Sequence, residues 1–349
     1  MNSNPGNPKN SNQGVTRRET LQAGALSALG AMGMSRSAAA DVSDFIEPGK
    51  AKSVIVLYLL GGAPTQDMYD LKPNAPKEIR GEFNPIATNV PGIDICELLP
   101  LTARWMHKSA IVRSVTHDAG CHNTLASYTG FEQKLPNITI TEEHYPPSMG
   151  SICEYLREQQ GGDIARTPAY VFLPCYLGWG QSIQRPGPYG GFLGKRYDPL
   201  FTVCDPYVDN PPEKPYEAHV LRGKPQVPFS TLSEGMTLDR LSARRNLLQG
   251  INDERFKEIS SGAVTSFNKQ SERAWSILTS SAVRSAFDFE SEDPETLKRY
   301  GNTLFGASTL AARKLVEAGV QYINVTWDIY WERLQLQFAG WDTHVKNFM

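Results

Sequence analysis

Apolar residues concentrate in four short runs along the chain, separated by longer segments with helical spacing. Continuous apolar runs of this length are typical of strands that are buried on both faces of a parallel sheet. The predicted strands are residues 53–60, 110–115, 168–173 and 320–326. The predicted helices are residues 97–108, 123–129, 149–159, 244–281 with an interruption near Ser261-Gly262, and 303–318. The last helix precedes Gly319, where a left-handed cap is expected.

Strands and helices alternate in this pattern, which predicts an α/β fold. Right-handed crossovers would produce a doubly wound, largely parallel sheet flanked by helices. Residues 176–229 break the alternation because they are dense in Pro, Gly and Tyr. Long irregular segments in compact domains are often functional, so we expect an excursion that lies over the sheet as a wall of a cleft. A solvent-facing insertion explains the same composition equally well.

The N-terminal residues indicate an export signal. Arg17-Arg18 precede an apolar segment, residues 21–34, and small residues follow at 38–40. The segment is shorter than the ~20 apolar residues that a spanning helix needs. We therefore predict a twin-arginine signal region within residues 1–40, export by the twin-arginine machinery, a periplasmic or other extracytoplasmic location, and a mature domain of residues 41–349. The alternative is a surface helix with a chance arginine pair.

Charge and cysteine content narrow the function classes. The net charge is −2, and no basic stripe marks a nucleic-acid surface. No later apolar run is long enough for a transmembrane helix. The five cysteines are Cys96, Cys121, Cys153, Cys175 and Cys204. They form no C-x-x-C pair, and their odd number leaves at least one unpaired thiol in an exported protein. Their pairing stays open at this level.

Ligands of open α/β sheets bind beyond the carboxyl ends of the strands, so the residues after each run are candidates. Gly61-Gly62 and two carboxylates, Asp67 and Asp70, follow the first run. Carboxylates at such a position suit a divalent metal. Ordinary turn chemistry is the alternative, because Asp favours loops.

Residues 116–130 follow the second run and form the most polar cluster of the chain. This cluster contains Cys121, His122 and Thr124. A helix that begins near Asn123 would offer backbone N–H groups to an anionic substrate beside a hydroxyl or thiol nucleophile. A capped helix with polar surface residues is the alternative.

Asp342 and His344 come after the fourth run, and zinc and related ions accept this mixture of ligands. All three groups follow predicted strands, so we expect them to gather at one edge of one sheet. The sequence therefore predicts a metal-assisted site for an anionic or oxygen-rich substrate.

The chain resembles the exported bacterial family called domain of unknown function fifteen-oh-one, which is grouped with the alkaline phosphatase and sulfatase superfamily. The resemblance rests on Arg17-Arg18 and on residues 51–73, 78–92, 111–117, 122–130, 299–301, 315–320 and 341–344.

This resemblance implies a metal-bound, alkaline phosphatase-like fold with Asp67 as the first metal ligand and Asp342 and His344 as later ligands. It places a nucleophile near a helix start before Thr129-Gly130. Cys121 and Thr124 are candidates for this role, or there is no nucleophile and His122 binds metal. A Cys-x-Pro-x-Arg motif is absent, so formylglycine is not expected.

The resemblance further implies an exported hydrolase of phosphate or sulfate esters that uses a divalent ion, zinc or calcium, on a small-molecule or carbohydrate substrate. The alternative is a non-catalytic pseudo-enzyme or a module that binds a carbohydrate or a partner. Such proteins usually continue beyond Trp-Asp-Thr-His with further strands and an Asp-His pair. Because Met349 lies five residues after His344, we expect a C-terminally truncated chain.

Overall fold

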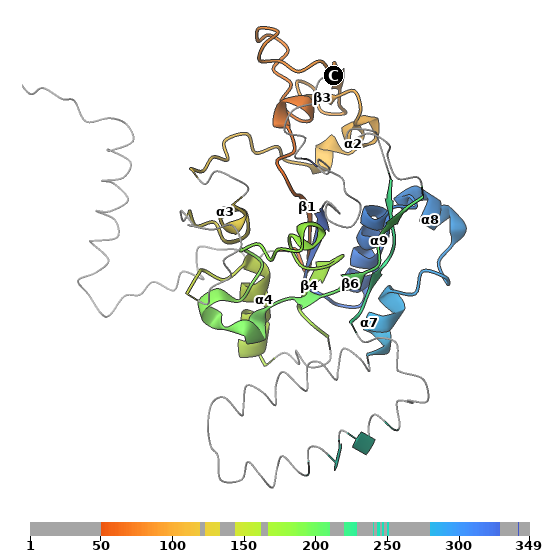
Figure 1. Cartoon of the computed structure of the whole chain (residues 1–349). Coiled ribbons are helices and arrows are strands. Elements are labelled where there is room, and N and C mark those ends of the chain that lie inside the picture. The colour runs from red at the N-terminus through yellow and green to blue at the C-terminus, as the bar shows by residue number, and fades with distance from the viewer. Residues whose placement is uncertain are drawn as a thin grey trace, which may run out of the picture. The chain divides into compact units, whose positions relative to one another are not determined.

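The structure is a computed structural model that describes residues 50–118, 123–132, 144–161, 167–209, 220–228, 280–328 and 341, with six residues between 240 and 250 (Figure 1). The chain divides into two units, Met1–Lys52 and Ser53–Met349, and the description below concerns the second. The predicted export signal and nearly all of the predicted helix 244–281 lie outside the described residues.

A parallel sheet of four strands forms the centre of the second unit, in the order β1-β10-β4-β5 (Figure 1). These strands are β1 (Val54–Leu59), β10 (Tyr322–Trp327), β4 (Tyr170–Leu173) and β5 (Leu200–Phe201). β10 pairs with β1 from Val54↔Tyr322 to Leu59↔Trp327 and with β4 on its other side. The predicted α/β class with a parallel sheet is confirmed.

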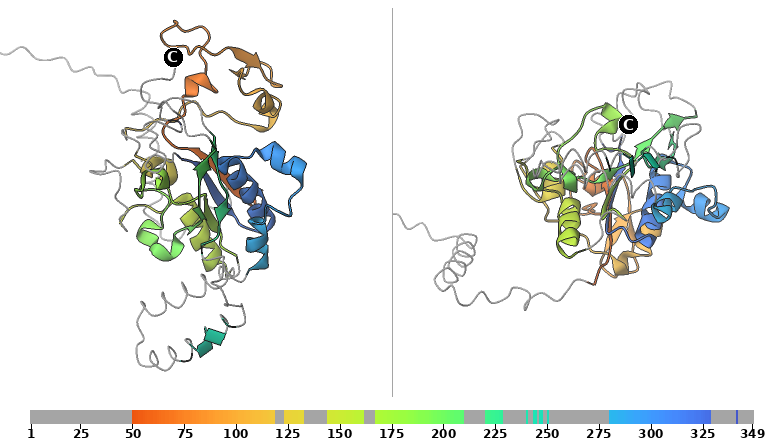
Figure 2. Two further views of the ribbon diagram at one scale, coloured as in Figure 1. Left: turned by 45° about the vertical axis from the view of Figure 1, so that its right-hand side comes forward. Right: turned by 90° about the horizontal axis from the view of Figure 1, so that it is seen from below.

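Helices cover both faces of the sheet, as the two views of Figure 2 show. On one face, Val171 and Leu173 of β4 and Ile323 and Val325 of β10 pack in one buried cluster with residues of α9 (Leu304–Glu317). This face also carries α7 (Ser281–Ala286) and α8 (Pro294–Tyr300). The other face carries α3 (Leu125–Thr129) and α4 (Met149–Gln159). Alternate residues of each strand therefore face different helical layers.

The helix boundaries follow from capping side chains. The Thr303 hydroxyl accepts a hydrogen bond from Gly306 N at 2.9 Å at the start of α9. The Ser148 hydroxyl accepts from Ser151 N at 3.1 Å at the start of α4. Such caps satisfy amides that lack a partner in the first turn. Gly319 has φ 92°, which confirms the predicted left-handed position after α9.

Two strand predictions are wrong in part. Residues 110–115 form no strand, and Val112 and Val115 are 67% and 76% exposed. β1 exists, but it is an edge strand rather than a strand buried on both faces, with Val54 and Leu57 43% and 51% exposed. An apolar run shows strand tendency but does not specify a partner, and no described strand pairs with the outer edge of β1.

The predicted helix 97–108 is largely wrong. The structure has only α2 (Pro100–Ala103) and a 3₁₀ turn, η4 (Met106–Lys108), in this region. These turns pack Ala103 and Met106 against Ile95 in a separate small cluster. Ile95 belongs to a hairpin of β2 (Pro85–Ala87) and β3 (Asp94–Cys96). Local packing against this hairpin replaces a continuous helix.

The excursion predicted at 176–229 contains only short elements in its described parts. These are the 3₁₀ helices η5 (Trp179–Gln181), η6 (Gly191–Leu193) and η7 (Lys195–Tyr197), then β6 (Val203–Cys204), β7 (Tyr207–Val208), β8 (Leu221–Arg222) and β9 (Pro225–Gln226). Residues 185–188 are buried, and Tyr197 donates to Glu158 of α4 at 2.6 Å. This part of the excursion packs onto the domain instead of facing solvent.

A buried glutamate joins α4 to the sheet. Glu154 is fully buried, and its Oε2 accepts hydrogen bonds from Ala169 N at 2.8 Å and Tyr170 N at 2.9 Å. The close approach requires Gly150, because a Cβ there would lie 2.6 Å from the Tyr170 ring. Glu154 thus satisfies the backbone at the entrance to β4.

We expect Glu154→Ala to lower the free energy of unfolding by about 3 kcal/mol, because two buried amides lose their acceptor. Urea unfolding followed by circular dichroism measures this change. Glu290→Ala, at an exposed site, should leave the free energy within about 0.5 kcal/mol. Equal effects of the two substitutions would show that the Glu154 hydrogen bonds contribute nothing.

Candidate functional site

Asp67 is the buried carboxylate of the loop that follows β1. It ends a 3₁₀ turn, η3 (Thr65–Asp67), and only 6% of the residue is exposed. Within the part of the chain that the structure describes, its buried Oδ1 has no hydrogen-bond partner. Burial raises the pKa of this carboxyl above its usual range. An uncompensated carboxylate of this kind is unfavourable for stability, which suggests that a ligand completes it.

Gly81 lies directly against this carboxylate. A Cβ added at Gly81 would be 2.0 Å from Asp67 Oδ1, so only glycine permits the observed contact. Gly81 belongs to the segment 78–92 on which the family resemblance rests. The sequence analysis did not assign Gly81 a role.

Asp70 does not join Asp67, although both carboxylates follow β1. Asp70 pairs with Lys72 and lies 3.6 Å from the Arg113 guanidinium. The hydrogen bond from Lys72 is the main reason that the pKa of Asp70 is lowered. Turn and ion-pair chemistry therefore describes Asp70.

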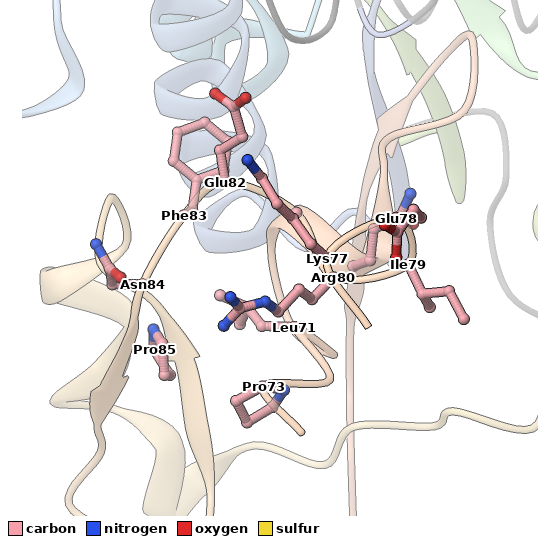
Figure 3. Close-up of a pocket in the computed structure, with 12 residues that line it drawn as sticks. Leu71, Pro73, Lys77, Glu78, Ile79, Arg80, Glu82, Phe83, Asn84 and Pro85 are labelled. Atoms are coloured by element: carbon pink, nitrogen blue, oxygen red, sulfur yellow. The ribbon is translucent and has the colours of Figure 1, made fainter. Parts of the chain in front are cut away.

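A cavity of about 550 Å³ lies beside the η3 loop (Figure 3). Gln66 and Gly81 line it, so it begins next to the residues that flank the Asp67 carboxylate. Its charged lining side chains are Lys77, Glu78, Arg80 and Glu82. Two basic and two acidic groups balance, so this lining has no net preference for an anion. A second cavity of about 450 Å³, lined by residues that include Tyr69, Met106 and Arg113, lies by the Asp70 ion pair.

Thr124, a candidate nucleophile, is 2% exposed at the start of α3. Its hydroxyl donates a hydrogen bond to the Pro186 carbonyl of the excursion. A reaction at Thr124 Oγ1 would first have to break this bond. α3 is confirmed as a short helix of five residues, too short to provide a developed N-terminal anion site.

Polar side chains of β10 face α3 inside the domain. Asn324 and Thr326 are buried, and Asn324 Nδ2 donates to Thr326 Oγ1 at 2.7 Å. The Tyr128 hydroxyl lies beside both side chains, and burial holds the pKa of this phenol well above its usual range. The Tyr128 ring packs on Tyr58 of β1, with 4.8 Å between ring centroids.

The sequence analysis missed this polar group. Its signal was the alternation of Asn324 and Thr326 with Ile323 and Val325, which marks a polar face on an interior strand.

Asp328 and two cysteines follow the carboxyl ends of three strands of the central sheet. Asp328 comes directly after β10, is 4% exposed, and accepts a hydrogen bond from Gly178 N at 3.0 Å through Oδ2. Cys175 follows β4, and Cys204 lies in β6 just after β5. The sequence analysis gave these three residues no role in a site.

The remaining predicted site residues, Cys121, His122, Asp342 and His344, lie outside the described residues. Trp341, the neighbour of Asp342 in sequence, is described, and its backbone N donates to Leu60 O at 3.4 Å, just after β1. Among the described residues, no three His, Cys, Asp or Glu side chains are grouped so that they could hold a metal ion. Asp67 is the one predicted metal ligand that lies among the described residues.

Comparison with known families supports the sequence resemblance. The model of the family described as Protein of unknown function (DUF1501) matches residues 51–349. The chain belongs to this family. In the same comparisons, no curated protein and no solved structure matches the chain. Among the described residues of this DUF1501 chain, no helix is long and apolar enough to cross a membrane.

We expect Asp67→Asn to raise the melting temperature by a few degrees near pH 7.5 in the presence of a chelator. The folded state raises the pKa of this carboxyl, so stability falls as pH rises from the unfolded pKa through the folded pKa, and the whole penalty is present above the folded pKa. Asn removes the charge and keeps the shape. Thermal unfolding from about pH 4 to about pH 7.5 measures the effect.

The difference between the two proteins should shrink as pH falls, and it should vanish below the unfolded pKa, where both states of the wild type are protonated. Asp293→Asn, at the exposed cap of α8, provides a control that should lower stability slightly, because this carboxylate accepts from Thr296 N at 3.0 Å. A lower melting temperature for Asp67→Asn at high pH would contradict the account.

Proposed function

We propose that this protein hydrolyses phosphate or sulfate esters of a small molecule or carbohydrate, with the help of a divalent ion such as zinc or calcium. The observation that carries the proposal is the buried Asp67 carboxylate, whose Oδ1 lacks a partner in the described part of the chain. Oxygen atoms of this kind are ligands for both ions.

The position of Asp67 supports the same proposal. It follows the carboxyl end of β1, the edge at which open α/β sheets bind ligands. The backbone of Trp341 is hydrogen-bonded to Leu60 at this end of β1, and Asp342 is the next residue in sequence. Asp342, His344 and His122 are the further ligands in this proposal.

A bound divalent ion would polarise the ester oxygen and stabilise the negative charge that develops on it. The residues of the chain have separate tasks. Asp67 would hold the ion, and the burial of its carboxylate would keep competing water away. Cys121 and Thr124 are the candidate nucleophiles, and the Thr124 hydroxyl would first have to release its hydrogen bond to Pro186.

Metal content and turnover test the proposal together. We expect purified wild type to bind a stoichiometric divalent ion after reconstitution and to hydrolyse an aryl phosphate or aryl sulfate. Asp67→Ala should lose at least about 100-fold in metal affinity, and turnover should fall with it. Absence of a stoichiometric ion in the wild type would sink the hydrolase proposal, and unchanged turnover in Asp67→Ala would remove Asp67 from the site.

Gly81→Ala tests the geometry without removing the carboxylate. The new methyl group would force the flexible end of Asp67 to rotate, because the two atoms would otherwise be 2.0 Å apart. We expect a roughly 10- to 100-fold loss of metal affinity with little change in melting temperature. Gly250→Ala, whose Cβ would meet nothing within 4 Å, is the matched control. Wild-type metal affinity in Gly81→Ala would contradict the predicted role of Asp67.

We further propose that the protein acts outside the cytosol after twin-arginine export. Arg17-Arg18 and the short apolar segment after them support this location. Residues 1–40 fused to a folded reporter should carry it out of the cytosol, and a double Lys substitution at Arg17 and Arg18 should block this transfer. Export that persists in the double variant would contradict the twin-arginine route.

A binding protein without catalysis is the second candidate, and an aromatic cluster favours it. Trp327, at the end of β10, is 42% exposed and packs on Phe305 and Trp341 at centroid distances of 4.7 and 5.4 Å. Exposed aromatic faces of this kind bind sugar rings. This candidate would be favoured if the wild type binds a saccharide but hydrolyses no ester. Trp327→Ala should then abolish the saccharide binding.

A further inference from the structure

Cys175 and Cys204 occupy equivalent positions on neighbouring chain segments. β4 and β5 pair in parallel with Phe172 opposite Phe201. Each cysteine lies three residues beyond its member of this pair. Neighbouring parallel strands are about 4.8 Å apart, within the range of Cα separations that a disulfide spans. The register ends at this pair, and the two chain segments continue from it into one packed cluster that contains both cysteines, although 28 residues separate them in the sequence.

The packing of the two cysteine side chains supports the same pairing. The two cysteines belong to the same packed cluster beyond the strand ends, and each thiol is the main influence on the pKa of the other. Both cysteines pack against the buried pair Trp179 and Leu304, and both remain only partly buried. A small oxidant can therefore reach them, whereas Cys96 is 1% exposed.

We propose that Cys175 and Cys204 form a disulfide that closes residues 176–203 into a covalent loop at the carboxyl end of the sheet. The proposal does not depend on ester hydrolysis, because it rests on strand pairing and on the packing of both cysteines in one cluster. It assigns one of the pairings that the sequence left open.

The reaction needs an oxidant of the disulfide class, such as oxidised glutathione. The Cys175 thiolate attacks one sulfur of the oxidant, forms a mixed disulfide and releases one thiolate. The Cys204 thiolate then attacks Cys175 Sγ and releases the second thiol. The protein loses two electrons and two protons, and the oxidant gains them as two thiols.

The local environment favours Cys175 as the first nucleophile. Interaction with the Cys204 thiol is the main cause that lowers the pKa of Cys175, and the same interaction is the main cause that raises the pKa of Cys204. Cys153 of α4 is a weaker competitor because burial raises the pKa of its thiol.

The closed loop contains the residues that cover α3. Pro186 accepts the hydrogen bond from Thr124, and a Cβ at Gly187 would lie 2.8 Å from the Tyr128 ring. Both ends of the loop would be fixed by one bond at the edge of the sheet. The disulfide would thereby limit the motion of this wall relative to α3.

Peptide mapping of the full-length protein tests the pairing. Wild type is oxidised with glutathione disulfide, alkylated under denaturing conditions and cleaved by trypsin, which cuts between the two cysteines after Lys195 and Arg196. We expect a linked peptide pair that contains Cys175 and Cys204 and separates on reduction. Alkylation of both cysteines after oxidation, or a link from either one to a different cysteine, would overturn the proposal.

Stability supplies a second readout on the same chain. Oxidised wild type should melt at a temperature higher than the reduced protein by roughly 5 °C, because the closed loop restricts the unfolded chain. Cys153→Ser should keep this difference and the linked peptides, while Cys175→Ser and Cys204→Ser should lose both. If the serine variants fold poorly, the comparison of oxidised with reduced wild type still decides the matter. Equal melting temperatures together with full alkylation would refute the bond.

Discussion

The sheet depends on the insertion of β10 between β1 and β4. β10 pairs with both strands in parallel, and Ser53 at the entrance to β1 donates to Val320 O across 267 positions of sequence. These contacts join segments from opposite ends of the described domain, so the ordering cost of a long chain segment has to be met before they form. Burial of Ile323 and Val325 against α9 on one face supplies the main compensation.

The same insertion decides where polar groups meet. Once β10 is central, its other face brings Asn324 and Thr326 beneath α3, and its carboxyl end brings Asp328 to Gly178. The order of strands also places β4 and β5 side by side, which brings Cys175 to Cys204. The candidate chemistry at this edge is thus a consequence of strand order, not of neighbouring positions in the sequence.

Two buried carboxylates show the difference between a structural group and a candidate functional group. Glu154 is buried and accepts from two backbone amides, so it joins α4 to β4. Asp67 is also buried, but among the described residues no backbone amide donates to its carboxylate, and burial raises its pKa. A carboxylate that the fold leaves uncompensated is a stronger indication of a ligand than burial alone.

The sequence by itself determined the α/β class, the sites of β1, β4, α4, α9 and β10, and the candidate Asp67 after the first strand. Periodicity and capping residues are local, so they are readable without a fold. The sequence could not determine that β1 is an edge strand, that residues 110–115 form no strand, or that Asp70 pairs with Arg113. Tertiary structure alone decided these points, and with them the contacts of Gly81 and the two cysteines, because each depends on which distant segments pack together.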